Sequence, residues 1–574
     1  MRTDFEAFAI RALNTSRKRY APTYVGLRLL LDSLPSLTSS DWGSRLVARK
    51  LDDHYSWRYR QFSEIKDFKL DRSIEYRDFL YGSPLTVIAE SHILQLLSKE
   101  PIFAPPNCAY SYLWPQPKSG SNYKYFMEGY KLRNNLVREM LSNNDGEGAL
   151  VLDIKKFYPS IDQQKLMRFI DGRLGNLKDR KVCGVTRHFI TNLVENCKAG
   201  IPIGPDLSHF LGHIALERVD NELTKRFGAK YLRYVDDIII LVSEITKNDV
   251  IGLVNSLLSK EGLELNDSKT DWVSSETYRM KSPIIEIEPR DTTFNRLLQE
   301  MSMYLMIHPS SYSDLKRMFL ENGFLLPFLR IKALAKYDRF RLYISIRKRN
   351  TLKVITQDKK YLLRKAIELR KNLAQKLVQK IDQPIPEHGI IRRWHVQEIR
   401  YCLNRMLYLY NFDEYGKLFQ LTPNIDEFAS TRTLIEAISK ENIMSVLNMP
   451  GSVISTFADL WSESEKGSLS LDWNFEKTKY IIDSLATLAL YRVIDIPDRF
   501  ISELSFAEKA LVEFCNGNHI FQRELQDLSY LDELRTLQIG KKREELHELL
   551  TTRLSTKEHF FLPGLFLGSE KYFS

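Results

Sequence analysis

A tetrapeptide near the middle of the chain, Tyr234-Val235-Asp236-Asp237, limits what this sequence can fold into more than any other segment. Apolar residues typical of strands flank it, Tyr231 and Leu232 before it and residues 238–242 after it. An acidic pair between two such runs predicts the tip of a β-hairpin. Because adjacent carboxylates repel each other, the tip needs a cation. Mg²⁺ suits it, since that ion binds carboxylates together with substrate phosphates.

A third carboxylate, Asp153, lies near the end of another apolar run, residues 149–154, which predicts a buried strand. Three Asp residues at the ends of adjacent strands are what two-metal phosphoryl transfer requires, with one ion at the attacking oxygen and the second at the leaving oxygen. An isolated Asp-Asp pair is more often a solvated turn. The order and spacing of the neighbouring motifs favour a metal site here.

The chain has 574 residues, more than one hydrophobic core can organise, which predicts two or three domains. Its net charge of +10 is concentrated, because residues 347–380 hold twelve Lys or Arg side chains against two acids. Such a block suits a polyanionic partner, with a solvated helix face as the alternative. Its candidate nucleic-acid-binding residues are Arg347, Lys348, Arg349, Lys359, Lys360, Arg364, Lys365, Arg370 and Lys371.

Composition also excludes several classes of protein. The five cysteines are scattered without a C-x-x-C pair, which indicates reduced thiols and no zinc site. Acidic residues within the first six positions leave no apolar core for a signal peptide. No apolar run approaches the roughly 20 residues of a membrane span. We therefore expect a cytoplasmic protein without a membrane partner.

The region around the acidic residues predicts an α+β domain. Residues 1–99 look mostly helical, and the Pro-rich stretch 101–117 favours an extended loop. The next part begins with a strand at 149–154, followed by a helix that Ser160-Ile161-Asp162-Gln163 opens and a second helix after Gly204-Pro205. The acidic hairpin comes next. A helix from Asn248 to Gly262 and a strand at 263–266 complete the series. This βαββαβ order is that of a ferredoxin-like layer.

The rest of the chain predicts a separate helical domain. Apolar residues recur at helical spacing from about residue 297, with helices expected at 361–381, 393–410, 475–493 and 508–550. We place the domains at residues 1–290 and 291–574. The second domain is expected to be all-helical, and a HEAT-like array of helices without clean sequence repeats is compatible with its pattern.

Four motifs follow one another in this chain: 153–161; 200–205 with Ser208; 234–237; and 262–266 with Lys269. Together they resemble motifs A to D of reverse transcriptases, over roughly residues 85–287. Segments 75–84 and 126–134 and the long helical C-terminal region are most similar to the bacterial antiphage class, the abortive-infection (Abi) and related defence-associated enzymes.

The resemblance implies a fingers-and-palm polymerase, a nucleotidyltransferase that uses dNTPs and two Mg²⁺ ions, or Mn²⁺ in their place. It assigns the metals to Asp153, Asp236, Asp237 and the backbone carbonyl of Ile154. It assigns the remaining roles as follows: Tyr158 as the steric gate against ribose, Gly204 and Ser208 beside the incoming nucleotide, Lys269 as proton donor to pyrophosphate, and Lys124 and Arg133 as triphosphate contacts.

The Abi resemblance further implies template-independent DNA synthesis primed on a protein side chain, within a homo-oligomer such as a trimer or hexamer. The product would be single-stranded DNA attached through a tyrosine, with Tyr20, Tyr24, Tyr55 and Tyr59 among the candidates. Ile203 stands where template-copying reverse transcriptases usually have Gln, which agrees with this interpretation. One alternative is a template-dependent reverse transcriptase that copies an associated noncoding RNA. The other is a catalytically idle nucleic-acid-binding scaffold or toxin.

Overall fold

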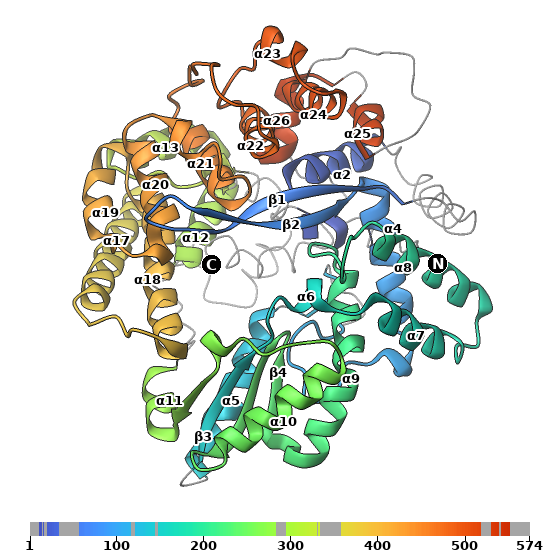
Figure 1. Cartoon of the computed structure of the whole chain (residues 1–574). Coiled ribbons are helices and arrows are strands. Elements are labelled where there is room, and N and C mark those ends of the chain that lie inside the picture. Colours follow the sequence, from blue (N-terminus) through green and yellow to red (C-terminus); the bar gives the residue numbers. More distant parts are fainter. Residues whose placement is uncertain are drawn as a thin grey trace.

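The structure of this protein is a computed structural model. It describes residues 8, 11–13, 15–16, 20–33, 57–115, 121–124, 126–143, 147–282, 294–329, 331–332, 358–517, 530–538 and 541–551. Figure 1 shows a four-stranded sheet with its helices in the lower half, and a long two-stranded hairpin that crosses the upper half among the C-terminal helices.

The four-stranded sheet confirms the predicted ferredoxin-like layer. It consists of β3 (Glu147–Asp153), β4 (Tyr231–Tyr234), β5 (Asp237–Ser243) and β6 (Asp271–Ser274). Their spatial order is β4-β5-β3-β6, and all neighbours are antiparallel. This is the order that a split βαβ arrangement produces.

Helices cover both faces of this sheet, and alternate strand residues point to opposite faces. Leu150, Leu152 and Ile240 share one core with α7 (Gln163–Leu174), α9 (Leu207–Phe227) and α10 (Lys247–Lys260). Val151 and Ile239 point to the other face, toward α5 (Phe126–Asn143) and α11 (Ser275–Lys281). With both faces buried, the strands are continuous apolar runs in the sequence.

The prediction that residues 263–266 form the fourth strand of the sheet is wrong. The fourth strand is β6, which lies later in the sequence. Leu265 makes only a single bridge, to Ile154. The amide of Lys155 donates to the Glu264 carbonyl at 2.9 Å, and the amide of Asn266 donates to the Asp153 carbonyl at 2.8 Å. Residues 264–266 therefore pair with the chain just beyond the end of β3, and the short 3-10 helix Asp267–Lys269 leads into β6.

The helix starts are close to their predicted positions. α9 begins at Leu207, soon after Pro205, as expected. The cap of α7 is Asp162, whose carboxylate accepts from the amide of Lys165 at 2.9 Å, and so it lies two residues after the predicted Ser160. The cap of α10 is Thr246, two residues before the predicted Asn248. Of the stretch 101–117 that was predicted as an extended loop, residues 101–103 form a short 3-10 helix, and residues 104–115 lie outside helices and long strands. Residues 116 and 117 lie outside the described residues.

The prediction that residues 1–99 are mostly helical is wrong for their central part. β1 (Tyr59–Phe68) and β2 (Ile74–Gly82) form a long antiparallel hairpin, which turns at Arg72 with a φ of 66°. The helices α2 (Ala21–Ser33) and α4 (Pro84–Leu97) lie on either side of the hairpin in the sequence. The apolar residues of β1 recur at every third position, Tyr59, Phe62, Ile65 and Phe68, and do not show the alternation that predicts a strand.

The C-terminal region is helical, as predicted. α17 (Lys359–Ile381), α18 (Gly389–Leu409) and α22 (Lys479–Leu490) coincide with three predicted helices. The segment predicted as one helix at 508–550 contains at least α24 (Phe506–Asn516), α25 (Tyr530–Gln538) and α26 (Arg543–Thr551). Further helices within the described residues of this region are α12 (Phe294–Ile307), α13 (Tyr312–Glu321), α19 (Tyr415–Leu421), α20 (Asp426–Ser439), α21 (Ser452–Glu463) and α23 (Asp498–Ser502).

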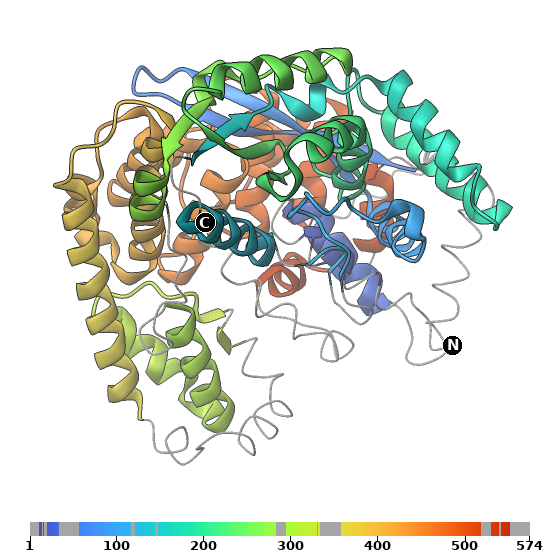
Figure 2. The same cartoon turned by 90° about the horizontal axis from the view of Figure 1, so that it is seen from below.

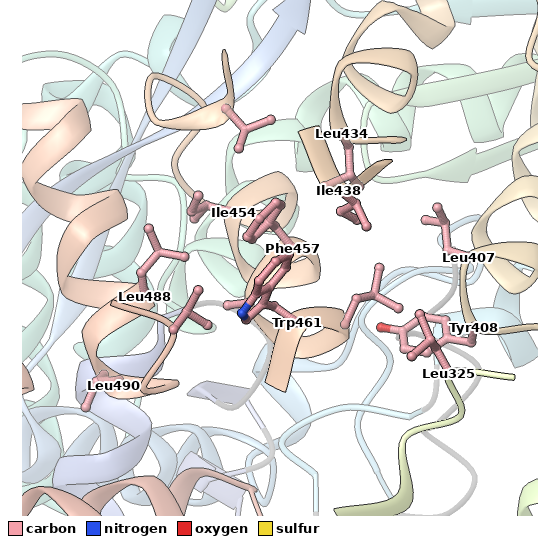
Figure 3. Close-up of a cluster of buried hydrophobic side chains, with 14 of the residues drawn as sticks. Leu325, Leu407, Tyr408, Leu434, Ile438, Ile454, Phe457, Trp461, Leu488 and Leu490 are labelled. Carbon is pink, nitrogen blue, oxygen red and sulfur yellow. The ribbon is translucent and has the colours of Figure 1, made fainter. Parts of the chain in front are cut away.

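The hairpin and α2 belong to the hydrophobic core of the C-terminal helices. Val25, Phe62 and Tyr81 are buried in the same cluster as residues of α12 to α26. Figure 3 shows the middle of this cluster, where Phe457 and Trp461 of α21 lie stacked. Polar contacts reinforce the packing: Arg60 binds Asp483 at 2.7 Å, and the hydroxyls of Thr23 and Tyr530 lie 2.7 Å apart. The β1–β2 hairpin and α2 therefore share one core with the helical region.

The structure bears on two expectations from composition, one about the cysteines and one about membrane spans. No disulfide joins any of the five cysteines, all of which lie within the described residues. Within the part of the chain that the structure describes, the helices are too short or too polar to cross a membrane.

Candidate active site

The sheet brings the three predicted aspartates to one edge. β3 and β5 pair so that Asp153 lies directly opposite Asp237, and Asp236 occupies the turn between β4 and β5. The amide of Ile154 donates to the Asp236 carbonyl at 3.3 Å, which fixes the turn against the end of β3. Strand register thus places Asp153 and Asp237 side by side, next to the turn that contains Asp236.

The acidic turn has an unusual backbone that is held from behind. Val235 has a φ of 57°, a conformation that β-branched residues rarely adopt. Its amide donates to Ser111 Oγ at 2.8 Å, and its carbonyl accepts from Arg233 Nη1 at 2.9 Å. Arg233 is itself buried in an ion pair with Asp220, with Nε to Oδ1 at 2.8 Å. Such support is what a strained turn at a functional site requires.

Asp153 is paired with a lysine. Its side chain is buried, and Lys269 Nζ lies 3.0 Å from each of its two oxygens. Asn266 Nδ2 donates to Oδ2 at 3.1 Å. The predicted proton donor therefore touches the predicted metal ligand directly, and its ammonium balances the charge of Asp153.

The other two aspartates have less charge compensation. Burial and the negative charges of Asp237 and Asp153 raise the pKa of Asp236 to about 7. Burial also raises the pKa of Asp237, against the opposing effect of the Arg133 and Arg393 guanidinium groups. Crowded, partly desolvated carboxylates of this kind attract a cation.

The predicted steric gate, Tyr158, is half-buried and held by a histidine. Its hydroxyl lies 2.7 Å from His209 Nδ1, and the imidazole of His209 is stacked on Tyr112 with ring centroids 3.5 Å apart. His209 and Tyr112 were not predicted from the sequence, since neither carries a motif signal. Their packing fixes the Tyr158 ring beside α9.

The predicted nucleotide-contacting residues of the 200–208 segment pack inside the protein. Gly204 has a φ of 122°, and a Cβ there would lie 2.6 Å from the carbonyl oxygen of Leu80 in β2. The amide of Leu80 donates to the Ile203 carbonyl at 2.8 Å. Ser208 is buried in the first turn of α9. The segment thus joins the hairpin to the sheet domain.

Comparison with known proteins identifies the central part of the chain. Residues 100–297 match the family model described as reverse transcriptase (RNA-dependent DNA polymerase). The chain contains a reverse transcriptase domain. The search of curated proteins gave no match.

Two solved telomerase structures are similar to the chain. Telomerase from Candida albicans, in complex with the TWJ fragment of telomeric RNA, is 11% identical, covers 68% of each chain and has a TM-score of 0.27. Apo telomerase from Candida tropicalis is 12% identical, covers 75% of this chain and 74% of its own, and has a TM-score of 0.29.

Domains of the reverse transcriptase family use divalent metal ions, and the donor set here fits one. Three carboxylates are hard oxygen ligands of the kind that Mg²⁺ prefers. Asp153 already carries one cationic partner, the Lys269 ammonium. As the side chains stand, no three His, Cys, Asp or Glu groups within the described ranges are close enough to hold an ion. Shared ligation would therefore require the carboxylates to turn toward one another.

The two predicted triphosphate contacts differ in position. Lys124 is exposed beside the reverse transcriptase core. Arg133 is buried, with its guanidinium 5.1 Å from the ring centre of Tyr130 and 5.3 Å from that of Tyr234. Arg133 therefore supports the acidic hairpin from within, and its positive charge favours ionised Asp237.

The basic block is only partly free for a ligand. Arg347, Lys348 and Arg349 lie outside the described residues. On α17, Lys365 binds Glu300 at 2.9 Å, and Arg370 binds Glu414 at 3.2 Å. Four other candidates are exposed on this helix, which lies along one side of the molecule in Figure 2: Lys359, Lys360, Arg364 and Lys371.

The candidate priming tyrosines are mostly enclosed. Tyr20 and Tyr24 are buried, with 4% and 3% of their surface exposed, and Tyr59 is half-buried. Tyr55 lies outside the described residues. In this conformation Tyr20 and Tyr24 are packed in hydrophobic cores and do not face solvent.

A further residue reaches the acidic hairpin from outside the reverse transcriptase domain. Arg393 of α18 places Nη1 4.0 Å from Asp237 Oδ1, and its Nη2 donates to the Lys269 carbonyl at 3.2 Å. Arg393 was not predicted from the sequence, because it stands in an ordinary helix without a motif.

Proposed function

We propose that this chain is an active DNA polymerase of the reverse transcriptase type, which adds dNTPs to a growing strand. The observation that carries the proposal is the register of β3 against β5, which sets Asp153 opposite Asp237 and beside Asp236. Three acids gathered at the ends of neighbouring strands would serve no structural purpose in a binding scaffold, since their mutual repulsion destabilises the fold. The retained acids therefore favour catalysis over the idle-scaffold alternative.

The residues of the site have separable roles in this proposal. Two Mg²⁺ ions bound by Asp153, Asp236 and Asp237 would activate the attacking hydroxyl and stabilise charge on the leaving oxygen. Lys269 balances the negative charge of Asp153 before substrate binds. Once the ammonium of Lys269 is released from Asp153, it can donate a proton to the leaving pyrophosphate. The hydroxyl of Tyr158 is bound to His209, so its ring stays fixed where it would exclude a ribose 2′-hydroxyl.

We further propose that synthesis is primed on a protein side chain and proceeds without a template, in antiphage defence and within a homo-oligomer. Two features support this part: the resemblance to Abi enzymes, and Ile203. The backbone of Ile203 is tied to Leu80 of the hairpin, and its apolar side chain offers no hydrogen bond to a template base pair. A polar residue at this point would favour copying.

Template-dependent copying of a bound noncoding RNA is the competing function. The description of the matching family as RNA-dependent favours it, and so does the exposed basic face of α17. A polyanion bound there would give salt-dependent affinity.

One experiment separates the two functions. Purified protein is incubated with labelled dNTPs and Mg²⁺, without template or primer, and the products are run on a denaturing gel before and after protease treatment. Label that stays with the protein until proteolysis supports self-primed synthesis. Incorporation only after addition of an RNA template and a primer supports copying.

The matched control for this experiment is the double variant Asp236→Asn with Asp237→Asn. We expect it to fold normally and to incorporate no label, because amides cannot replace carboxylates as Mg²⁺ ligands. Incorporation equal to that of the wild type would overturn the assignment of the site.

A further inference from the structure

The contacts of α18 connect the helical region to the acidic hairpin. We infer that Arg393 is a positioning residue of the polymerase site, supplied by the helical region and acting through Lys269 and Asp237. This inference rests on the proposed polymerase function for its kinetic test. Its structural part concerns the fold alone and is tested separately.

The start of α18 is docked on the sheet domain by two contacts besides Arg393. Asp271 of β6 accepts a hydrogen bond from the amide of Ile390 at 3.1 Å, next to Gly389, which has a φ of 81°. A Cβ on Gly389 would lie 2.3 Å from Asp271 Oδ2, so the carboxylate approaches the helix as closely as the backbone allows. Trp394 packs edge-on against Tyr278 of α11, with ring centroids 5.2 Å apart.

These contacts fix where Arg393 points. Trp394 is buried in the same cluster as Val151, Ile239 and Leu241, on the face of the sheet away from α9 and α10. Arg393, the preceding residue, therefore emerges at the rim of the sheet, where its guanidinium reaches both Asp237 and the turn that carries Lys269. The planar guanidinium can hold two acceptors at once, which an ammonium group does less well.

The consequence is a connected set of groups around the reacting centre. Arg393 holds the Lys269 carbonyl, Lys269 holds Asp153, and Arg393 also faces Asp237. One side chain from another region of the protein thus faces Asp237 at 4.0 Å and is linked to Asp153 through the backbone of Lys269. Partners that orient metal ligands in this way typically contribute about 10- to 100-fold in activity or metal affinity.

The kinetic test uses the full-length chain with Arg393→Ala, under the template-free or the poly(rA)·oligo(dT) condition that supports incorporation by the wild type. We expect kcat to fall by about 10- to 100-fold, with a smaller change in KM for the dNTP. Arg393→Lys should restore part of the loss. The matched control is Arg392→Ala, which removes the same charge one residue away, where the guanidinium binds Glu427 at 2.6 Å. We expect Arg392→Ala to retain wild-type kcat.

A double-mutant cycle tests whether Arg393 acts through Lys269. In a Lys269→Ala background, Arg393→Ala should cause a smaller loss than it does in the wild type, because the group that it positions is already gone. Losses that simply multiply, or an Arg393→Ala variant with wild-type kcat, would overturn the inference.

The structural test does not need activity. The amides of Lys269 and Thr270 are bonded within the turn at 3.0 Å and 3.2 Å, and they should exchange with solvent faster in Arg393→Ala than in Arg392→Ala. Equal protection in both variants would refute the positioning role. A wild-type protein that incorporates no nucleotide would count against the proposed function, while the exchange result would still decide the role of Arg393.

Discussion

At the scale of single residues, Asp236 shows most directly how the acids of the site affect one another. Burial and the two neighbouring carboxylates raise its pKa to about 7, well above its ordinary value of 3.8. Between these two pH values the folded protein holds a proton that the unfolded chain has lost. Without a divalent ion, the stability that this proton provides should therefore decline as the pH rises from about 4 to about 7.

The measurement is thermal unfolding of wild-type protein and Asp236→Asn in the presence of EDTA across this pH range. The variant should show a flatter dependence of Tm on pH, since its amide does not titrate. Identical pH profiles for the two proteins would mean that Asp236 ionises normally.

Tyr158 allows a second prediction at this scale. Replacing it with Ala removes the ring that His209 holds in place, and we expect the protein to incorporate rNTPs at a rate closer to that for dNTPs. The measurement is the ratio of the two incorporation rates. His209→Ala is the intermediate variant, because it removes the hydrogen-bond partner of Tyr158 and leaves the Tyr158 ring in place. Unchanged sugar discrimination in Tyr158→Ala would exclude the gate role.

At the scale of elements, the segment around Gly204 makes the close backbone contact between the hairpin and the sheet domain. Gly204→Ala places a methyl group 2.6 Å from the Leu80 carbonyl at a φ of 122°, so the backbone must shift. We expect a loss of about 1–3 kcal/mol in the free energy of unfolding. Gly172→Ala in α7 is the matched control: apart from the backbone of its own helix, no atom of the described residues lies within 4 Å of the position that its Cβ would take, and the change should stabilise the helix slightly. Chemical denaturation compares the two, and equal stabilities would contradict the close packing.

The elements also show what sequence patterns can and cannot predict. The strand containing Asp153, the acidic hairpin and α9 were predictable, because continuous apolar runs and regular helical spacing are local signals. The fourth strand was misplaced because Leu263 and Leu265 alternate with polar residues as they would in a strand, yet residues 264–266 pair with the chain at the end of β3. The β1–β2 hairpin was missed because the apolar residues of β1 recur at every third position, a spacing closer to that of a helix than to the alternation of a strand.

At the scale of the whole molecule, the candidate site could be predicted only in part. Asp153, Asp236 and Asp237 meet through strand register, which the sequence encodes locally. Arg393 meets Lys269 from 124 residues away, through the docking of a helix whose own sequence is ordinary. Such a contact depends on tertiary packing, for which one sequence has no local signal. The boundary between domains at residue 290 stays a prediction.

The basic face of α17 gives a prediction at the same scale. Neutralising its exposed cations should weaken nucleic-acid binding and reduce its dependence on salt, since fewer counterions are released. The set to change is Lys359, Lys360, Arg364 and Lys371. A control set of ion-paired lysines in the same region is Lys417, Lys440, Lys466 and Lys477. Binding of a labelled single strand is measured over a range of salt concentrations. An equal salt slope in the two sets would indicate that α17 is an ordinary solvated face.

The core that α2 and the hairpin share with the last helices has a consequence for biosynthesis. Thr23 contacts Tyr530 across 507 residues of sequence, and Arg60 contacts Asp483 across 423. At ordinary translation speeds of about 5–20 residues per second, the N-terminal segments leave the ribosome roughly 20 to 100 s before their partners exist. During that interval the apolar faces of α2 and the hairpin are exposed on the nascent chain. We therefore expect the newborn protein to depend on chaperones, and a ribosome that stalls before residue 480 to release an aggregation-prone fragment.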